Sequence, residues 1–134
     1  MPLGEIRVAI NSDQDIVTAR QEGRVLATRL CFSSVDATFI ATAISELARN
    51  ILAYAGKGEI MLRATHGSNR EGILVVASDN GPGIRDIPQA LRDGFSTSGS
   101  LGLGLPGVRR LMDEFEIKSQ PGRGTTVSVK KWKR

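Results

Sequence analysis

Four short elements in a fixed order constrain this chain more than any other feature of its sequence. Glu46 and Asn50 lie one helical turn apart inside an apolar helical pattern, and Asp79 begins the run Asp-Asn-Gly-Pro-Gly directly after an apolar stretch. A second glycine-rich run, Gly-Leu-Gly at 102–104, precedes another helical pattern, and a Gly-Arg-Gly-Thr run ends at Thr125. A carboxylate and an amide so spaced can hold a water and a divalent cation, and glycine-rich turns let backbone approach a nucleotide closely. Together these elements indicate an ATP site.

Apolar periodicity predicts where the helices and strands lie. The expected elements are a strand at 6–10, a helix over about 12–30, a second helix that begins at 33 or 34, strands at 59–65 and 72–78, a short helix near 87–92, a helix that begins near 106, and closing strands at about 116–120 and 125–132. The polar loop between the two middle strands contains the lone His66, which makes a catalytic histidine an unfavoured interpretation.

An apolar stripe along the second helix predicts which of its faces is buried. The stripe consists of Ile40, Ile44, Leu47, Ile51 and Tyr54. At 100° per residue, Glu46 and Asn50 lie about 100° away from the stripe, on the border between buried and exposed positions. Ser45 and Arg49 fall on the opposite face, where we expect exposure. A side chain on such a border can line a pocket.

The order of the four elements resembles that of the Bergerat-fold (GHKL) ATPases, the superfamily of gyrase, Hsp90, MutL and the histidine kinases. The N box, the G1 and G2 glycine boxes and the terminal Gly-x-Gly-Thr element all match, over about residues 40–126. The runs at 93–99 and 105–115 are similar to those of small bacterial serine/threonine kinases of the anti-sigma factor kinase family, in particular its stressosome switch kinases. The resemblance implies an α/β two-layer sandwich, with a mixed five-stranded sheet, about three helices on one face and a glycine-rich ATP lid at about 81–104.

Composition and length fit one ATP-binding kinase domain over residues 1–134. Hydrophobic residues make up 40% of the chain and charged residues 24%, and no apolar run reaches the roughly 20 residues of a membrane span. The first residues lead directly into a strand pattern and do not resemble a signal peptide. We therefore expect a cytoplasmic protein with no membrane partner.

Charge and cysteine usage leave two further interpretations open. The net charge is +4, and the basic cluster at 130–134 could neutralise nucleic-acid phosphates. Because aromatic residues are only 4% of the chain, we favour a solvated strand end and expect no nucleic-acid partner. Cys31 is the single cysteine, and its apolar neighbours Leu30 and Phe32 favour a buried structural thiol over a redox role.

Each candidate site residue has a chemical role and an ordinary alternative. Glu46 is the best candidate for general base and Asn50 for an oxygen ligand of Mg²⁺, although both could be plain helix residues. By the resemblance, Asp79 accepts a hydrogen bond from the adenine amino group, while Gly81 and Gly83 let the turn lie against the base. An aspartate there could also simply start a turn.

The remaining candidates belong to the phosphate and adenine sides of the expected site. Gly102 and Gly104 open a helix whose first-turn amides could meet the phosphates, although the bare pattern is only a glycine-rich helix entry. The resemblance places Thr125 near the adenine, where a strand residue could otherwise only pair across the sheet. Tyr54 occupies a position where many relatives have histidine.

The resemblance implies a protein serine/threonine kinase that uses ATP and Mg²⁺. Such a kinase phosphorylates STAS-domain stressosome scaffold or antagonist proteins and, once released, binds and activates a PP2C-type phosphatase in a partner-switching stress-response pathway. One alternative is an anti-sigma factor kinase that sequesters a sigma factor. Another is a non-catalytic nucleotide-sensing module, against which Glu46 argues because a sensor needs no base. The chain has no Walker A pattern and no helical hairpin with a phosphoacceptor histidine, so we expect the acceptor on another protein.

Overall fold

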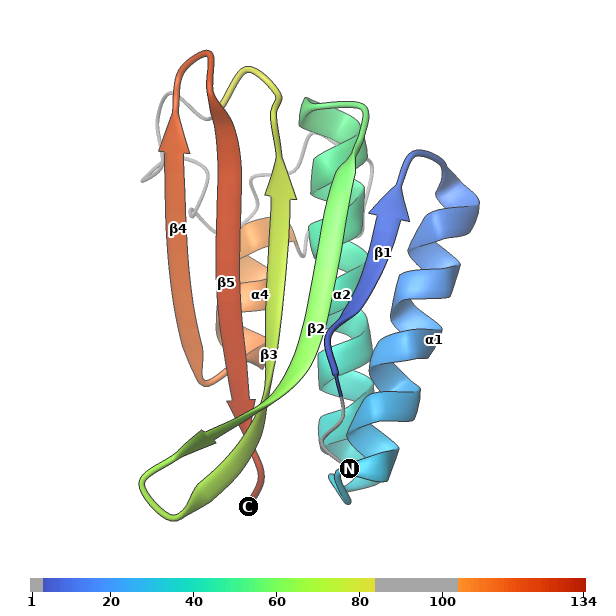
Figure 1. Cartoon of the computed structure of the whole chain (residues 1–134), viewed down its shortest axis with the longest axis vertical. Coiled ribbons are helices and arrows are strands. Elements are labelled where there is room, and N and C mark those ends of the chain that lie inside the picture. Colours follow the sequence, from blue (N-terminus) through green and yellow to red (C-terminus); the bar gives the residue numbers. More distant parts are fainter. Residues whose placement is uncertain (1–3, 84–103) are drawn as a thin grey trace.

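In the computed structural model, the described residues form a five-stranded sheet that three helices cover on one face (Figure 1). The structure describes residues 4–83 and 104–134. In chain order the elements are β1 Ile6–Ile10, α1 Asp13–Arg29, α2 Ser34–Tyr54, β2 Gly58–Gly67, β3 Arg70–Asp79, α4 Gly104–Leu111, β4 Glu114–Gln120 and β5 Gly124–Trp132. The predicted α/β two-layer sandwich is confirmed. The short helix expected near 87–92 and most of the expected lid lie outside the described residues.

The described strands pair antiparallel throughout, in the order β1-β2-β3-β5-β4, whereas the sequence predicted a mixed sheet. Between β3 and β4 the chain forms α4, and a strand-helix-strand connection usually joins parallel neighbours. Here β5 folds back from β4 as a hairpin and inserts between β3 and β4. β3 and β4 therefore run in the same direction but never pair, and β4 becomes an edge strand.

Side-chain caps fix where α1 and α2 begin. Asp15 Oδ2 accepts hydrogen bonds from the backbone N–H of Ser12 at 3.1 Å and of Asn11 at 2.8 Å. Ser33 Oγ accepts the N–H of Asp36 at 3.1 Å. Such caps satisfy N–H groups that have no partner within the helix, and each typically contributes about 1 kcal/mol. The boundaries predicted from Ser12 and Ser33 are accordingly confirmed.

The turn between α1 and α2 shows that the predicted burial of Cys31 is wrong. Cys31 occupies the left-handed backbone region with φ 65°, and its thiol is exposed. The turn is tight, because the N–H of Cys31 donates to Thr28 O and that of Phe32 to Ala27 O, each at 3.0 Å. Phe32, 8% exposed, occupies the core position instead.

α2 is enclosed on more sides than its apolar stripe predicts. The stripe residues at 0–2% exposure are Ile40, Ile44, Leu47 and Ile51. Ser45 was expected on the exposed face but is 5% exposed, and its hydroxyl donates to Ala41 O at 3.1 Å. The helix lies between α1 and α4 on the sheet, so flanking helices cover the sides that a surface helix would leave open (Figure 1). None of the described helices is long and apolar enough to cross a membrane.

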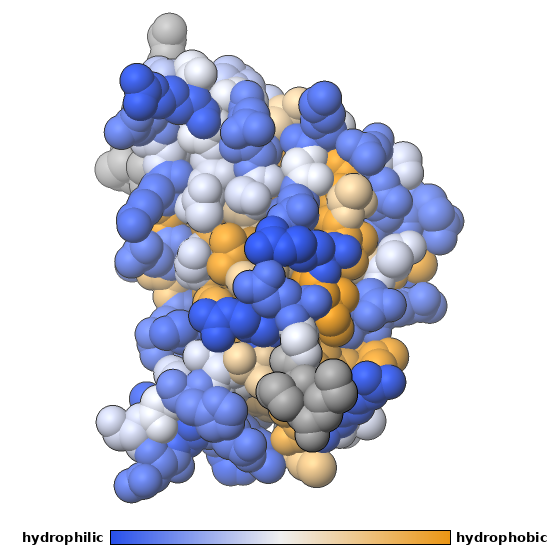
Figure 2. Space-filling model, viewed as in Figure 1, coloured by the Kyte–Doolittle hydropathy of each residue, from blue (hydrophilic) through white to orange (hydrophobic). Residues whose placement is uncertain are grey.

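None of the described helices covers the opposite face of the sheet, where hydrophilic and hydrophobic residues are mixed (Figure 2). A shallow groove on this face lies over β3, β5 and β4, and its lining includes Leu74, Val76, Glu114, Glu116, Ser128 and Lys130. Edge strand β4 alternates exposed charged residues with half-buried Phe115 and Ile117, which pack against the core on the helix side. This is the alternation expected of an antiparallel sheet with one buried face.

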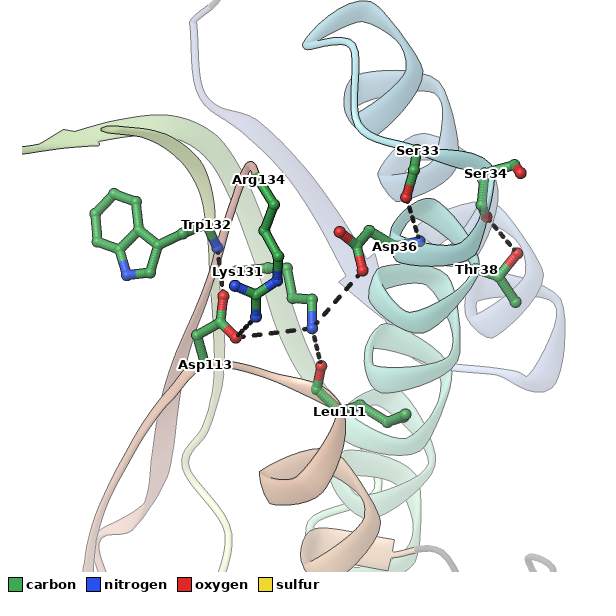
Figure 3. A network of polar contacts seen from close by, with 9 residues as sticks. All are labelled: Ser33, Ser34, Asp36, Thr38, Leu111, Asp113, Lys131, Trp132 and Arg134. Carbon is green, nitrogen blue, oxygen red and sulfur yellow. Dashed lines mark hydrogen bonds and ion pairs between the residues drawn. The ribbon is translucent and has the colours of Figure 1, made fainter. Parts of the chain in front are cut away.

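The basic C-terminal cluster is built into the fold, which corrects the expected solvated strand end (Figure 3). Lys131 of β5 is 6% exposed, and its Nζ donates to Leu111 O, at the end of α4, at 2.7 Å. Asp113 Oδ1 lies 3.8 Å and Asp36 Oδ1 4.0 Å from the same Nζ. A buried ammonium needs such partners because loss of water disfavours an unpaired charge. Lys131 thus joins the start of α2, the end of α4 and the start of β4.

Trp132, the residue after Lys131, packs at the same end of the sheet. Its indole Nε1 donates to Glu114 Oε2 at 2.6 Å, and the Arg70 guanidinium lies 4.4 Å from the ring centroid. A Cβ atom at Gly67 or Gly72 would come within 2.8 Å of an indole ring atom, so the lack of side chains there lets the β2–β3 hairpin lie on the ring.

We predict that Lys131→Met destabilises the protein by about 2 to 3 kcal/mol, because it removes the cation and leaves two carboxylates and a helix-end carbonyl without it. This is below the usual figure for fully buried pairs, since Asp36 and Asp113 retain 16% and 19% side-chain exposure. Urea unfolding followed by circular dichroism measures the change. Lys133→Met, which removes a more exposed lysine paired with Glu71, is the control. Equal stability of the two variants would contradict a structural role for Lys131.

Candidate functional site

A pocket of about 330 Å³, open mouth included, lies between α2, α4, β3 and β5. Its lining residues are Leu47, Asn50, Ile51, Tyr54, Ala77, Asp79, Leu105, Thr125 and Val127. The structure therefore brings together four of the predicted binding residues from three separate parts of the sequence: Asn50, Tyr54, Asp79 and Thr125. Apolar walls with a few convergent polar groups are typical of small-molecule sites.

Asp79 ends β3 with one carboxylate oxygen engaged by the fold. Asp79 pairs with Thr125 in the β3–β5 register, and its Oδ1 accepts the N–H of Gly81 at 2.9 Å and that of Thr125 at 3.3 Å. Both of these hydrogen bonds from described residues to the Asp79 side chain use Oδ1. Oδ2 is left to accept a donor from a ligand, as an exocyclic amino group on a purine would supply.

Two glycines set the backbone around Asp79. Gly83 has φ +81°, and a Cβ atom there would collide with Gln120 O. Gly124 has φ +95°, and a Cβ atom there would collide with Asp79 O. Only glycine combines this backbone conformation with such close approach. The turn after β3 and the start of β5 can therefore lie directly against each other below the pocket.

Ser119 is a site neighbour that sequence reasoning missed. It lies opposite Thr125 in the β4–β5 register, and the two hydroxyl oxygens are 2.8 Å apart. Ser119 Oγ also donates to Gly124 O at 3.1 Å. The Thr125 hydroxyl is therefore oriented from the edge strand. This neighbour follows from strand register, which apolar alternation alone does not give.

Glu46 and Asn50 present polar atoms that the fold leaves without partners. Glu46 is 3% exposed, and its Oε1 accepts a hydrogen bond from Arg49 Nη1 at 2.9 Å. Within the described part of the chain, Glu46 Oε2 and Asn50 Nδ2 are buried with no hydrogen-bond partner. Leaving such an atom unsatisfied typically costs about 1 to 3 kcal/mol. Unmet buried polar atoms beside a pocket fit a site that a polar ligand completes.

This donor set is compatible with Mg²⁺ held mainly by a nucleotide. The described residues contain no group of three His, Cys, Asp or Glu side chains that could hold a metal ion by themselves. Mg²⁺ usually keeps several waters and takes one or two protein oxygens together with phosphate oxygens. Asn50, which lines the pocket beside buried Glu46, supplies an amide oxygen suited to that role.

The start of α4 faces the pocket. Gly104 is the first residue of the helix, buried and with φ +46°, and Leu105 lines the pocket. Free N–H groups and the helix dipole make such a terminus favourable for phosphate. Gly102, predicted to act beside Gly104, lies outside the described residues.

One pocket is bordered by a helix asparagine, a strand that ends in aspartate and a helix N-terminus, and a buried glutamate lies one turn before the asparagine. This arrangement is typical of an ATP-binding ATPase domain. Residues 35–134 match the family described as histidine kinase-, DNA gyrase B-, and HSP90-like ATPase. The chain belongs to this family.

Among curated proteins, the chain is similar to the serine/threonine-protein kinase RsbT of Bacillus subtilis (strain 168). The two are 54% identical over 127 residues, which cover 95% of this chain and 96% of that protein. An anti-sigma F factor from Caldanaerobacter subterraneus subsp. tengcongensis is 33% identical over 129 residues, covering 92% of this chain and 89% of that protein.

Solved structures share the fold at low sequence identity. The mycobacterial sensor histidine kinase MprB matches with a TM-score of 0.55 and 17% identity, over 98% of this chain and 99% of that one. A chain of the SiaB-SiaC complex from Pseudomonas aeruginosa matches with a TM-score of 0.56 and 14% identity, over 98% and 90%. These similarities support the sandwich architecture alone.

We predict that Asp79→Asn weakens ATP binding while the fold stays intact. The asparagine oxygen can keep the bonds to Gly81 and Thr125, but its amide nitrogen then faces the adenine amino group, and two donors oppose each other. The expected loss is about 1 to 3 kcal/mol, or about five- to 150-fold in Kd. Titration calorimetry measures it, with Glu116→Gln on β4 as the control. Wild-type affinity in a folded Asp79→Asn protein would refute the adenine assignment.

Proposed function

We propose that this chain is an ATP- and Mg²⁺-dependent protein serine/threonine kinase, with residues 1–134 acting as one catalytic domain. The observation that carries the proposal is Glu46, one turn before a pocket-lining asparagine: a buried carboxylate of which one oxygen has no partner among the described residues. A nucleotide sensor has no use for a buried base at that position. The 54% identity to a protein named as a serine/threonine kinase supports the same conclusion.

Nucleotide binding is assigned to residues of α2, β3 and β5 and to the start of α4. Asp79 Oδ2 accepts the adenine amino group, with Thr125 and Tyr54 beside the base. The turn containing Gly81 and Gly83 lies along the base, and the backbone amides at Gly102 and Gly104 bind phosphate oxygens. Asn50 would hold the magnesium ion through its amide oxygen, and the ion would supply positive charge that offsets the charge of the phosphates.

Phosphoryl transfer requires a base within reach of the acceptor hydroxyl. Glu46 Oε2 accepts the proton of a serine or threonine hydroxyl on another protein, while the oxygen of that hydroxyl attacks the γ-phosphorus. The bond between the γ-phosphorus and the bridging oxygen breaks, and ADP leaves with the electron pair. Burial of Glu46 keeps water from competing for the proton.

The protein partners follow from the family resemblance and the similarity to RsbT. The proposed substrates are STAS-domain scaffold or antagonist proteins of a stressosome, in the cytoplasm. After phosphorylating them the kinase leaves, then binds and activates a PP2C-type phosphatase, which makes it a partner switch in stress signalling. No nucleic-acid or membrane partner is proposed.

A second candidate function is supported by the similarity to anti-sigma F factors. In that case the same site phosphorylates an antagonist, while another surface sequesters a sigma factor. Incubation with labelled ATP, Mg²⁺ and the STAS-domain products of neighbouring genes, followed by phosphosite mapping, tests the kinase proposal. Absence of phosphoserine and phosphothreonine on every candidate would reject it. Pull-down of a sigma factor rather than a phosphatase would favour the second function.

We predict that Glu46→Gln keeps ATP·Mg²⁺ binding but slows transfer by about 10² to 10⁴-fold, since that is the usual contribution of a general base. Asn50→Ala should lose the part of ATP affinity that depends on Mg²⁺. Calorimetry with and without Mg²⁺ and single-turnover transfer assays separate the two effects. Unchanged transfer by Glu46→Gln would exclude Glu46 as the base.

We also predict that scaffold and phosphatase bind the kinase in competition, and that phosphorylation weakens scaffold binding. The phosphoryl group adds about −1.5 to −2 charge at pH 7 and would face the carboxylate of Glu46. Glu46→Gln, which cannot mark the scaffold, should remain bound to it in the presence of ATP. Biosensor measurements with both scaffold forms provide the test. Simultaneous binding of both partners to one kinase, or equal affinity for both forms, would refute the switch and leave the kinase proposal intact.

A further inference from the structure

Arg49 touches the buried carboxylate at the proposed catalytic position. Its Nη1 lies 2.9 Å from Glu46 Oε1, and both residues belong to α2, three positions apart. The Arg49 side chain is 40% exposed, whereas that of Glu46 is 4% exposed. The ion pair therefore spans the boundary between the protein interior and the surface. The sequence placed Arg49 on the exposed face of the helix, away from any site.

We infer that Arg49 is a positioning residue that holds Glu46 with Oε1 engaged and Oε2 directed to the acceptor hydroxyl. The kinetic part of this inference rests on the proposed kinase function, whereas the ion pair itself does not. The two oxygens of Glu46 have different surroundings, because Oε1 accepts from the guanidinium and Oε2 is buried without a partner among the described residues. A carboxylate held through one oxygen cannot rotate freely, so the other oxygen keeps one direction.

The physical basis is the difference between this pair and an ordinary pair on a helix surface. Two exposed side chains three positions apart gain little from pairing, because water solvates both charges. Glu46 has lost nearly all its contact with water, so its charge depends on the remaining cation. Removing that cation leaves a buried charge unpaired. Rotation of the carboxylate toward another hydrogen-bond donor would then be favourable.

A different role for the same arginine makes a different prediction. A guanidinium on the γ-phosphate would favour ATP over ADP, since ADP lacks that group. A residue that acts only through Glu46 changes the affinity for neither ATP nor ADP. Its replacement also has no effect on the transfer rate once Glu46 has been replaced. The two roles separate in binding measurements that need no acceptor protein.

The first experiment tests the ion pair in the protein without nucleotide or metal. Thermal unfolding is compared for wild type, Arg49→Met, Glu46→Gln and the double variant. We expect Arg49→Met to lower Tm on the order of 5 °C, and the double variant to recover most of that loss because a neutral amide needs no cation. Additive losses would overturn the pairing. Arg24→Met, which removes an exposed arginine bonded to Thr38 near the other end of α2, is the matched control.

The second experiment tests the effect on transfer. We expect Arg49→Met to lower the single-turnover rate by about tenfold or more, with Kd values for ATP and ADP within about twofold of wild type. Arg49→Lys should recover part of the rate, because lysine keeps the charge but not the planar fork. In the Glu46→Gln background, Arg49→Met should cause no further loss.

Several outcomes would overturn the positioning role. They are a wild-type rate for Arg49→Met, a selective loss of ATP over ADP affinity, or a further loss of rate in the Glu46→Gln background. Failure of the proposed kinase function is recognised separately, because the wild-type protein would then phosphorylate no acceptor, and a wild-type rate for Glu46→Gln would exclude Glu46 as the base. The thermal comparison would still decide whether Arg49 and Glu46 are paired.

Discussion

The burial of α2 is the constraint on which the rest of the structure depends. This helix supplies the centre of the core through its apolar stripe, and the same turns carry buried Glu46 and the pocket-lining Asn50. α1 and α4 enclose it on the sheet, so Glu46 lies in surroundings of low polarity although it belongs to a regular helix. Electrostatic interactions are stronger there than in water, and fixed groups need no reorganisation when a ligand arrives. The fold thus requires α2 to be buried, whereas the proposed chemistry requires polar side chains on the same helix.

α4 shows how a short element can serve a site. A helix of eight residues has little stability of its own, because nucleation is unfavourable and few hydrogen bonds follow. Val108 and Leu105 anchor it in the core, and Lys131 of β5 donates a hydrogen bond to its last carbonyl. Its N-terminus can therefore face the pocket at a defined place. The C-terminal strand contributes to the site at both ends, through Thr125 directly and through Lys131 by way of α4.

The sequence predicted the architecture well because its patterns are local. Helix caps at Ser12 and Ser33, the stripe of α2 and the alternation of the strands each depend on neighbours in the chain. Apart from Cys31, which a tight local turn exposes, the errors concern contacts between distant segments. The sheet is antiparallel because β5 inserts beside β3, and Lys131 is buried because Asp36 and Asp113 converge on it.

The candidate site divides in the same way. The pocket gathers Asn50, Tyr54, Asp79 and Thr125, whose spacing the motifs already indicated, while Gly102 lies outside the described residues. Ser119 and Arg49 were missed, because their importance comes from strand register and from the loss of water around Glu46. Neither quantity can be obtained from the spacing of residues along the chain.

The position of Trp132 determines what the protein's own fluorescence can report. It is the single tryptophan, and it pairs with Gly72 at the end of β3 opposite Asp79. Seven residue steps along a strand correspond to about 23 Å, too far for a bound base to contact the indole. The surroundings of the indole include instead the Arg70 guanidinium and the Glu114 carboxylate, and its emission reports on them. Any change in that emission on adding nucleotide would be a signal carried along the length of the sheet, which makes this residue a natural optical probe of communication between the two ends of the molecule.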